Sequence, residues 1–258
     1  MPSAGKAHAM HPVGLLAVLV AFTLLAGACL EAPPDERPVR GEPSDTTTSE
    51  TEPFDAATIE AQPLRAEGVE RFAREVTLRV RNLGCGRVVT GSAVAIDGDL
   101  LVTNRHVVEG ADALEVTTWD GTTMTVAVAR AATTHDIAVA EVGGELPNVA
   151  PVAAADPEPG DRVLVAGYPG GGGLSLEEGR MVARTSDRLF GADAGALALD
   201  VEVAPGSSGG PVLDRDGQLV GVIYALAVEG GRGFAVPVTA LQDALEAGDA
   251  LVDVPECR

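Results

Sequence analysis

From about residue 76 onward the chain consists of short apolar runs, four to nine residues long, separated by glycine, proline and aspartate. Valine is frequent in these runs, and several alternate apolar with polar residues, a pattern that predicts β-strands. Six runs precede residue 145: 76–80, 88–96, 99–104, 114–119, 124–130 and 137–142. Six more follow residue 158: 162–167, 180–185, 196–203, 211–214, 218–224 and 233–238.

Turn signals between the runs favour antiparallel connections. Three Asp-Gly pairs stand between such runs, at 97–98, 120–121 and 216–217, and Asp-Gly is a strong hairpin signal. Two sets of six short antiparallel strands with glycine-rich connections indicate two small β-barrels, over about 76–145 and 158–238. The predicted fold class is therefore all-β.

Two segments follow a helical pattern instead. Residues 68–76 are predicted to form a short helix before the first strand. Residues 239–248 are predicted to form a C-terminal helix, with Thr239 as its N-cap, Gln242 three residues further on, and Gly248 at its end. The complete prediction is two six-stranded antiparallel barrels with a short C-terminal helix.

Residues 1–28 differ from the rest, because an apolar run from Val13 to Leu25 follows one lysine and two histidines. The run is short for a membrane span and has the layout of a secretory signal peptide. The Ala-Gly-Ala-Cys sequence at 26–29 resembles a bacterial lipobox. Lipidation of Cys29 would hold the protein on the outer face of a membrane. Cleavage for soluble secretion and an uncleaved anchor are the alternatives.

Residues 29–66 are rich in Pro, Glu, Asp, Thr and Ser and carry few large apolar side chains. They cannot bury enough apolar surface to offset the entropy of ordering, so a disordered acidic tether is predicted before a globular domain at 67–258. The whole chain has 18 basic and 38 acidic residues, a formal net charge of −20. It lacks the clustered Lys and Arg that phosphates require, which argues against nucleic acid as a partner.

The segment APGSSGGPV at 204–212 is made almost wholly of small residues. Gly and Ser are common in turns, so a flexible connection is one interpretation. A nucleophilic serine is the other, and it needs a histidine as base and a carboxylate that orients the histidine. His106 follows an apolar strand, where a rigid scaffold can hold it beside a cleft. Asp136, next to His135, opens the strand at 137–142.

His106, Asp136 and Ser208 occur in the chain order of the chymotrypsin-type arrangement. The sequence resembles the trypsin-like serine protease superfamily at all three positions, through TNRHVV, THDIAVAEV and GSSGGPV. The resemblance covers about Val76 to Val238. It is nearest to the bacterial DegP/HtrA branch and to membrane-tethered periplasmic proteases of actinobacteria. It implies a chymotrypsin-like fold for the two barrels.

The resemblance also implies roles. Ser208 is the implied nucleophile, His106 the general base and then acid, and Asp136 the residue that orients the imidazole. The backbone N–H groups of Gly206 and Ser208 are implied to form the oxyanion hole. Ser207 stands where digestive enzymes carry an aspartate that pairs with a new amino terminus, so that activation is not expected. Neither a metal nor an organic cofactor is expected.

Three cysteines are present, Cys29, Cys85 and Cys257. If Cys29 is lipidated or removed, the other two form an even pair, and a disulfide is the default in an oxidising compartment. Two unpaired thiols are the alternative. The actinobacterial proteases carry cysteines at matching places, which also implies a Cys85–Cys257 bridge. DegP/HtrA proteins usually continue into a PDZ domain, but the sequence stops at Arg258, so none is expected here.

The substrate pocket is predicted to lie beside the nucleophile, on the segment before it and on a neighbouring strand. The expected lining residues are Val203, Ala204, Tyr224, Ala225 and Leu226. Such a lining favours an apolar side chain of small or medium size before the scissile bond. Glu202 near the pocket floor, selecting Lys or Arg, is the alternative.

Two hypotheses of function follow. In the first, the chain is an extracytoplasmic serine endopeptidase that hydrolyses peptide or protein substrates through an acyl-enzyme. It is then a lipoprotein on the outer face of the bacterial cell membrane, or it is secreted. In the second, it is a catalytically silent protease-fold protein that binds or senses a ligand at the cell surface. A non-proteolytic esterase-like hydrolase is a third possibility.

Overall fold

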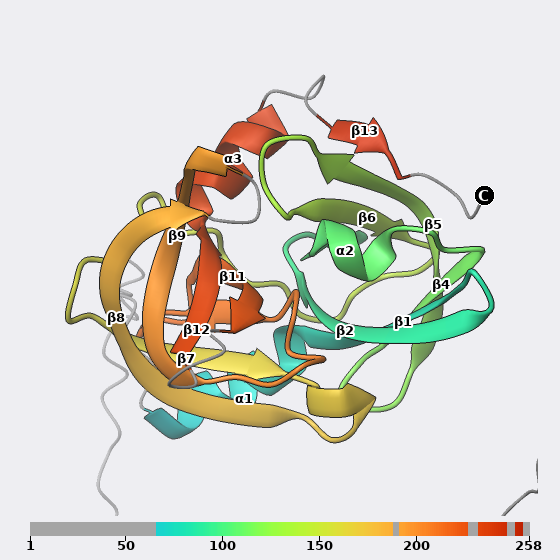
Figure 1. Cartoon of the computed structure of the whole chain (residues 1–258). Coiled ribbons are helices and arrows are strands. Elements are labelled where there is room, and N and C mark those ends of the chain that lie inside the picture. Colours follow the sequence, from blue (N-terminus) through green and yellow to red (C-terminus); the bar gives the residue numbers. More distant parts are fainter. Residues whose placement is uncertain (1–65, 188–190, 227–231, 247–250, 255–258) are drawn as a thin grey trace, which may run out of the picture. The chain divides into compact units, whose positions relative to one another are not determined.

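The computed structural model describes residues 66–187, 191–226, 232–246 and 251–254 (Figure 1). The predicted signal peptide and almost all of the predicted tether lie outside the described residues. The described residues belong to one compact unit, 56–258. None of their helices is long and apolar enough to cross a membrane.

The first barrel is closed by six antiparallel strands. They are β1 (Thr77–Gly84), β2 (Arg87–Ala95), β3 (Leu100–Thr103), β4 (Ala113–Thr117), β5 (Thr123–Ala132) and β6 (Ala138–Val142). The order is β5-β4-β1-β2-β3-β6, and β6 pairs again with β5. Each of the six strands overlaps one of the first six predicted runs.

The second barrel has the same number of strands. They are β7 (Arg162–Gly167), β8 (Ser175–Asp187), β9 (Gly191–Glu202), β10 (Pro211–Leu213), β11 (Leu219–Leu226) and β12 (Arg232–Pro237). Their closed order is β10-β11-β12-β9-β8-β7. The predicted chymotrypsin-like pair of barrels is therefore confirmed, and Figure 1 shows the yellow-to-orange second barrel beside the green first one.

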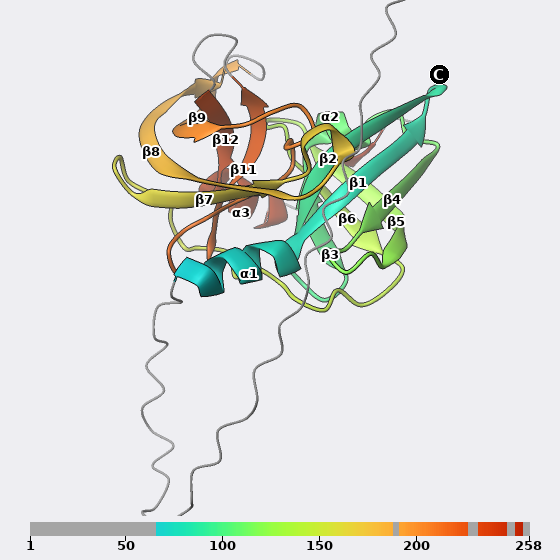
Figure 2. The same ribbon diagram turned by 90° about the horizontal axis from the view of Figure 1, so that it is seen from below.

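Aliphatic side chains fill both barrels and the space between them. One buried cluster joins Val76 of α1 (Ala66–Val76), Ile137 before β6, Leu213 of β10 and Leu241 of the C-terminal helix. Figure 2 shows α1 lying alongside β7 and leading into β1. Since segments of both barrels share this cluster, burial of apolar surface holds the barrels together.

The C-terminal helix α3 (Val238–Glu246) is confirmed, but its predicted cap is wrong. Thr239 lies inside the first turn, where its backbone N–H and Oγ1 donate to the Asp156 carboxylate at 3.0 and 2.9 Å. Gln242 does not complete a capping box, because its Nε2 donates to the Ala153 carbonyl at 2.8 Å. The helix is therefore capped by a carboxylate that is distant along the chain.

One more strand, β13 (Leu251–Asp253), was not predicted. It pairs antiparallel with β5, with Leu251 opposite Ala132 and Asp253 opposite Arg130. The chain thus returns to the first barrel after α3, although α3 packs on the second barrel.

Cys85 and Gly86 form the two-residue turn between β1 and β2, with φ angles of 52° and 69°. Two positive φ angles suit a tight hairpin turn. Cys29 and Cys257 lie outside the described residues. The pairing of Cys85 with Cys257 stays a prediction.

Candidate active site

His106 stands on a short helix, α2 (Arg105–Val108), which follows β3. Val107 is fully buried beside it, whereas 46% of the His106 side chain is exposed. Asn82, buried on β1, donates from Nδ2 to the carbonyls of Val107 and Glu109 at 2.9 and 3.1 Å. The backbone of α2 is therefore fixed to the barrel while the imidazole faces solvent.

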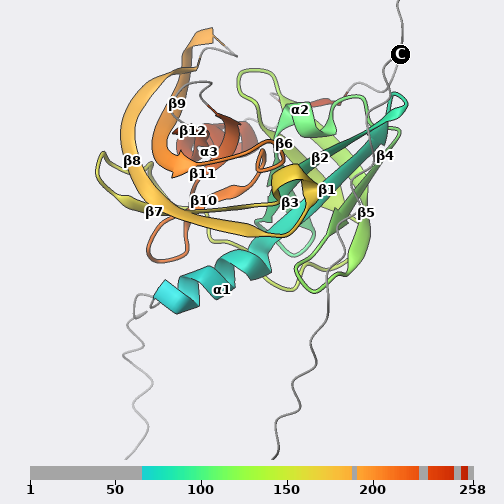
Figure 3. The same ribbon diagram turned by 60° about the horizontal axis from the view of Figure 1, so that its bottom comes forward.

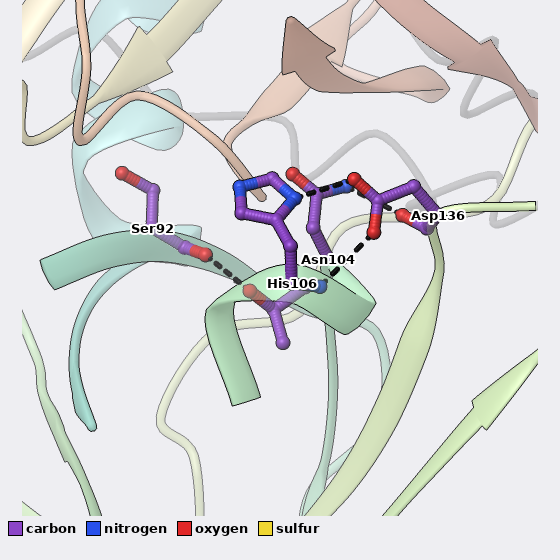
Figure 4. Close-up of polar contacts among 5 residues, drawn as sticks. Ser92, Asn104, His106 and Asp136 are labelled. Atoms are coloured by element: carbon purple, nitrogen blue, oxygen red, sulfur yellow. Dashed lines mark hydrogen bonds and ion pairs between the residues drawn. The ribbon is translucent and has the colours of Figure 1, made fainter. Parts of the chain in front are cut away.

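Asp136 lies two residues before β6, and only 2% of its side chain is exposed. Its Oδ2 lies 2.5 Å from His106 Nδ1, and its Oδ1 accepts the backbone N–H of His106 at 3.1 Å (Figure 4). Asn104, fully buried, donates from Nδ2 to the Asp136 carbonyl at 2.7 Å. Both carboxylate oxygens thus hold one histidine, which fixes the ring and leaves Nε2 for proton transfer.

The nucleophile loop, defined here as residues 204–210 between β9 and β10, depends on two glycines. Gly206 and Gly209 have φ angles of 101° and 88°, in the region that favours glycine. A Cβ on Gly206 would lie 2.6 Å from the Tyr168 carbonyl oxygen, and one on Gly209 would lie 2.0 Å from that of Ser92. No other residue fits either place without displacing backbone.

The two serines of the nucleophile loop have different surroundings. Ser207 is 5% exposed, and its Cα would lie 3.0 Å from a Cβ on Gly167. Ser208 is partly exposed. Access to substrate therefore favours Ser208 as the nucleophile, in line with the role that the resemblance implies.

Ser208 lies close to α2. A Cβ on Gly91 of β2 would be 2.6 Å from Val107 Cγ1 and 3.2 Å from the Ser208 carbonyl oxygen, so these two residues flank the same glycine. In the part of the chain that the structure describes, no hydrogen bond joins the Ser208 hydroxyl to His106. Such hydrogen bonds often tighten only when substrate binds.

The backbone N–H groups of the nucleophile loop divide into two kinds. Those of three residues donate to backbone carbonyls: Ser207 to Ala204 at 3.0 Å, Gly209 to Ile223 at 2.7 Å, and Gly210 to Ser207 at 2.9 Å. Those of Ala204, Gly206 and Ser208 have no acceptor among the described residues, and Pro205 has no N–H. An N–H without a partner in the protein is available to a ligand, and those of Gly206 and Ser208 are the pair predicted to form the oxyanion hole.

The residues predicted to line the substrate pocket differ in their burial. Val203 is half-buried and Ala204 is exposed, whereas Tyr224 is 6% exposed and joins the buried cluster between the barrels. The side chains of Ala225 and Leu226 lie outside the described part of the structure. The pocket and its preference stay predictions.

Three polar residues of the site were not predicted from the sequence: Asn82, Ser92 and Asn104. All three are at most 2% exposed and lie in or beside apolar strands. A buried polar side chain needs a hydrogen-bond partner, so a lone polar residue within an apolar run is the signal that marks such positions.

Comparison with known proteins agrees with this geometry. Residues 91–222, just over half of the chain, match the family model described as trypsin-like peptidase domain. The serine protease Do-like HtrA of Bacillus subtilis is 32% identical over 151 residues, which are 53% of this chain and 33% of that protein. A DegP-like protein of Halomonas elongata, named as a periplasmic serine endoprotease, is 29% identical over 168 residues, 63% of this chain and 34% of that one.

A solved structure extends the comparison to three dimensions. The inactive form of Rv3671c from Mycobacterium tuberculosis, as a serine-to-alanine variant, matches with a TM-score of 0.62 and 26% identity. The match covers 70% of this chain and 90% of that one. The chain spans less than half the length of the curated relatives it matches. By its fold and its family match, the chain belongs to the trypsin-like peptidase domain family.

Proposed function

We propose that this chain is a serine endopeptidase whose catalytic residues are Ser208, His106 and Asp136. The observation that carries the proposal is the Asp136–His106 pair, with one carboxylate oxygen on the ring and the other on the backbone of the same histidine. A histidine held in this way beside a partly exposed serine suits acyl transfer. The names of the relatives, which are serine proteases, support the same reaction.

The proposed reaction has two halves. The Ser208 Oγ attacks the scissile carbonyl carbon while His106 Nε2 takes the hydroxyl proton, and the Asp136 carboxylate stabilises the imidazolium that forms. The oxyanion accepts hydrogen bonds from the N–H groups of Gly206 and Ser208. Collapse of the intermediate breaks the C–N bond, and the leaving amine takes the proton from Nε2. Water then hydrolyses the acyl-enzyme by the same steps.

A fluorophosphonate probe tests this proposal directly, together with hydrolysis of a casein-type protein substrate. We expect wild type to be labelled on Ser208 and to cleave the protein, whereas Ser208→Ala does neither. Ser207→Ala is the matched control for the register of the motif and is expected to be labelled. Wild-type protein that is folded but neither labelled nor active would favour the silent binding protein instead. Labelling without proteolysis would favour the esterase-like hydrolase.

The protein is proposed to act outside the cytoplasm, anchored by a lipid on Cys29. The periplasmic name of a relative supports the compartment, and the lipobox-like sequence supports the anchor. In a bacterial host, wild type is expected to partition with membranes and Cys29→Ala to be released. A Cys29→Ala variant that still partitions with membranes would contradict lipidation.

Cys85 is proposed to pair with Cys257. The disulfide-bonded state of Cys85 supports a bridge at this turn. Mass spectrometry of the mature protein, alkylated with and without reductant, is expected to find one linked peptide pair that contains both residues. An unchanged alkylation pattern would rule the bridge out.

The proposed preference is for a small or medium apolar side chain before the scissile bond. Val203, whose Cγ1 would lie 3.2 Å from a Cβ on Gly233, is held against β12 next to the nucleophile loop. A peptide library that varies this position tests the preference in wild type and in Glu202→Gln. Cleavage after Lys or Arg that Glu202→Gln abolishes would overturn the apolar pocket.

A further inference from the structure

The Ser92 side chain links the two barrels at the nucleophile loop. Ser92 lies on β2 of the first barrel and is fully buried. Its Oγ is 2.8 Å from the Gly206 carbonyl oxygen and 2.9 Å from the Tyr168 backbone nitrogen. Both of these partners belong to the second half of the chain.

The directions of these two hydrogen bonds follow from the chemistry of the partners. A backbone N–H only donates, so Ser92 Oγ accepts from Tyr168. A carbonyl oxygen only accepts, so the Ser92 hydroxyl proton is given to Gly206. One hydroxyl thus uses its donor and one acceptor position, and it connects the start of the segment 168–171 with the nucleophile loop.

Gly206 is the residue where a fixed carbonyl matters most. Glycine at a φ of 101° has a wide range of accessible conformations, and rotation about its backbone bonds re-aims the flanking peptide planes. The two neighbouring peptides are held by backbone groups, since Gly170 donates to the Pro205 carbonyl at 2.8 Å and Gly210 donates to that of Ser207 at 2.9 Å. In the peptide between them, the Ser207 N–H donates to the Ala204 carbonyl at 3.0 Å, and the Gly206 carbonyl is held by Ser92.

Ser92 also holds the backbone of Ser208. The Ser92 N–H donates to the Ser208 carbonyl at 2.7 Å, and the Ser92 carbonyl accepts from Thr103 Oγ1 at 2.6 Å. Figure 4 draws Ser92 in the same close-up as His106 and Asp136. Figure 3 shows the yellow segment around Pro169–Gly171, which supplies the other contacts, beside β1 and β2. Of the described side chains, that of Ser92 is the one that hydrogen-bonds to the nucleophile loop.

We infer that Ser92 is a positioning residue that holds the oxyanion hole in its working shape. This inference rests on the proposed function, because an oxyanion hole matters only if Ser208 is acylated. Ser207 carries no charge that an amino terminus can pair with, so the loop needs another restraint. The Ser92 hydroxyl supplies one that is already present in the uncleaved chain.

The test compares Ser92→Ala with Thr77→Val in steady-state peptide hydrolysis. Each variant removes a fully buried hydroxyl, and that of Thr77 donates to the Ala73 carbonyl, away from the nucleophile loop. For Ser92→Ala we expect kcat to fall about 100-fold, the typical cost of losing one oxyanion donor, with KM changed by less than about threefold. The acid limb of the pH–rate profile should stay in place, because His106 and Asp136 are untouched.

The outcomes separate this inference from the proposed function. Equal kcat in Ser92→Ala and Thr77→Val, with an active wild type, would overturn the inference alone. An inactive, unlabelled wild type would overturn the proposed function. If Ser92→Ala does not fold, Ser92→Cys keeps a group of similar size with a weaker donor. We then expect about a tenfold lower kcat, and a wild-type kcat in Ser92→Cys would overturn the inference.

Discussion

The two halves of the site are held in place by different means. In the first barrel, side chains hold His106, since the carboxylate of Asp136 and the amide of Asn82 bind its ring and its helix. In the second barrel, the nucleophile loop takes its shape mainly from glycine φ angles and backbone hydrogen bonds, with the hydroxyl of Ser92 as the one side-chain contact among the described residues. Catalysis should therefore be most sensitive to changes of side-chain chemistry in the first half of the site, and to changes of backbone conformation in the second.

The largest effect on catalysis is expected when the Asp136 carboxylate is replaced. Asp136→Asn keeps the size of the side chain but replaces one carboxylate oxygen by an N–H donor, which favours the wrong tautomer of His106. We expect kcat to fall on the order of 10⁴-fold with little change in KM. Steady-state kinetics and thermal unfolding of wild type and variant measure this. A fall of less than about tenfold in a folded variant would mean that Asp136 does not orient His106.

A smaller effect on catalysis is expected when the backbone conformation of the nucleophile loop is changed. Gly206→Ala places a Cβ 2.6 Å from both Tyr168 O and Gly170 N, at a φ of 101°. The loop must shift, and we expect kcat to fall about 100- to 1,000-fold. Gly98→Ala is the matched control, because a Cβ there meets nothing within 4 Å and no positive φ is involved. Similar kinetics in both variants would show that loop shape does not limit catalysis.

The same contrast explains what the sequence could predict. Twelve strands were found because each is a separate apolar run that ends in turn residues. The helix α2 and the strand β13 were missed, since four and three residues are too few to show a period. His106 and Asp136 were found as motifs, and their hydrogen bond adds the geometry.

Contacts between residues that are distant along the chain could not be predicted, because no local sequence pattern contains them. Asp156 caps α3 from 83 residues away, and Ser92 reaches Gly206 over 114 residues. For α3 the local sequence offered another answer, because Thr239 looked like an N-cap. Ser92 lies within the predicted run 88–96, and nothing in that run marks it. Only the closure of both barrels brings these partners together, so tertiary structure decides them.

The smallest effect concerns stability beside the nucleophile loop. Burial raises the pKa of the Tyr168 phenol, and the charge of Arg79 opposes this only in part. Because the folded state holds this proton more tightly than the unfolded state, the free energy of unfolding should decrease as pH rises above about 10, the pKa of an unperturbed tyrosine. Tyr168→Phe removes this one titration, so its stability should decline less steeply than that of wild type. Urea unfolding at pH 8, 9.5 and 10.5 measures the difference, and parallel declines in the two proteins would contradict it.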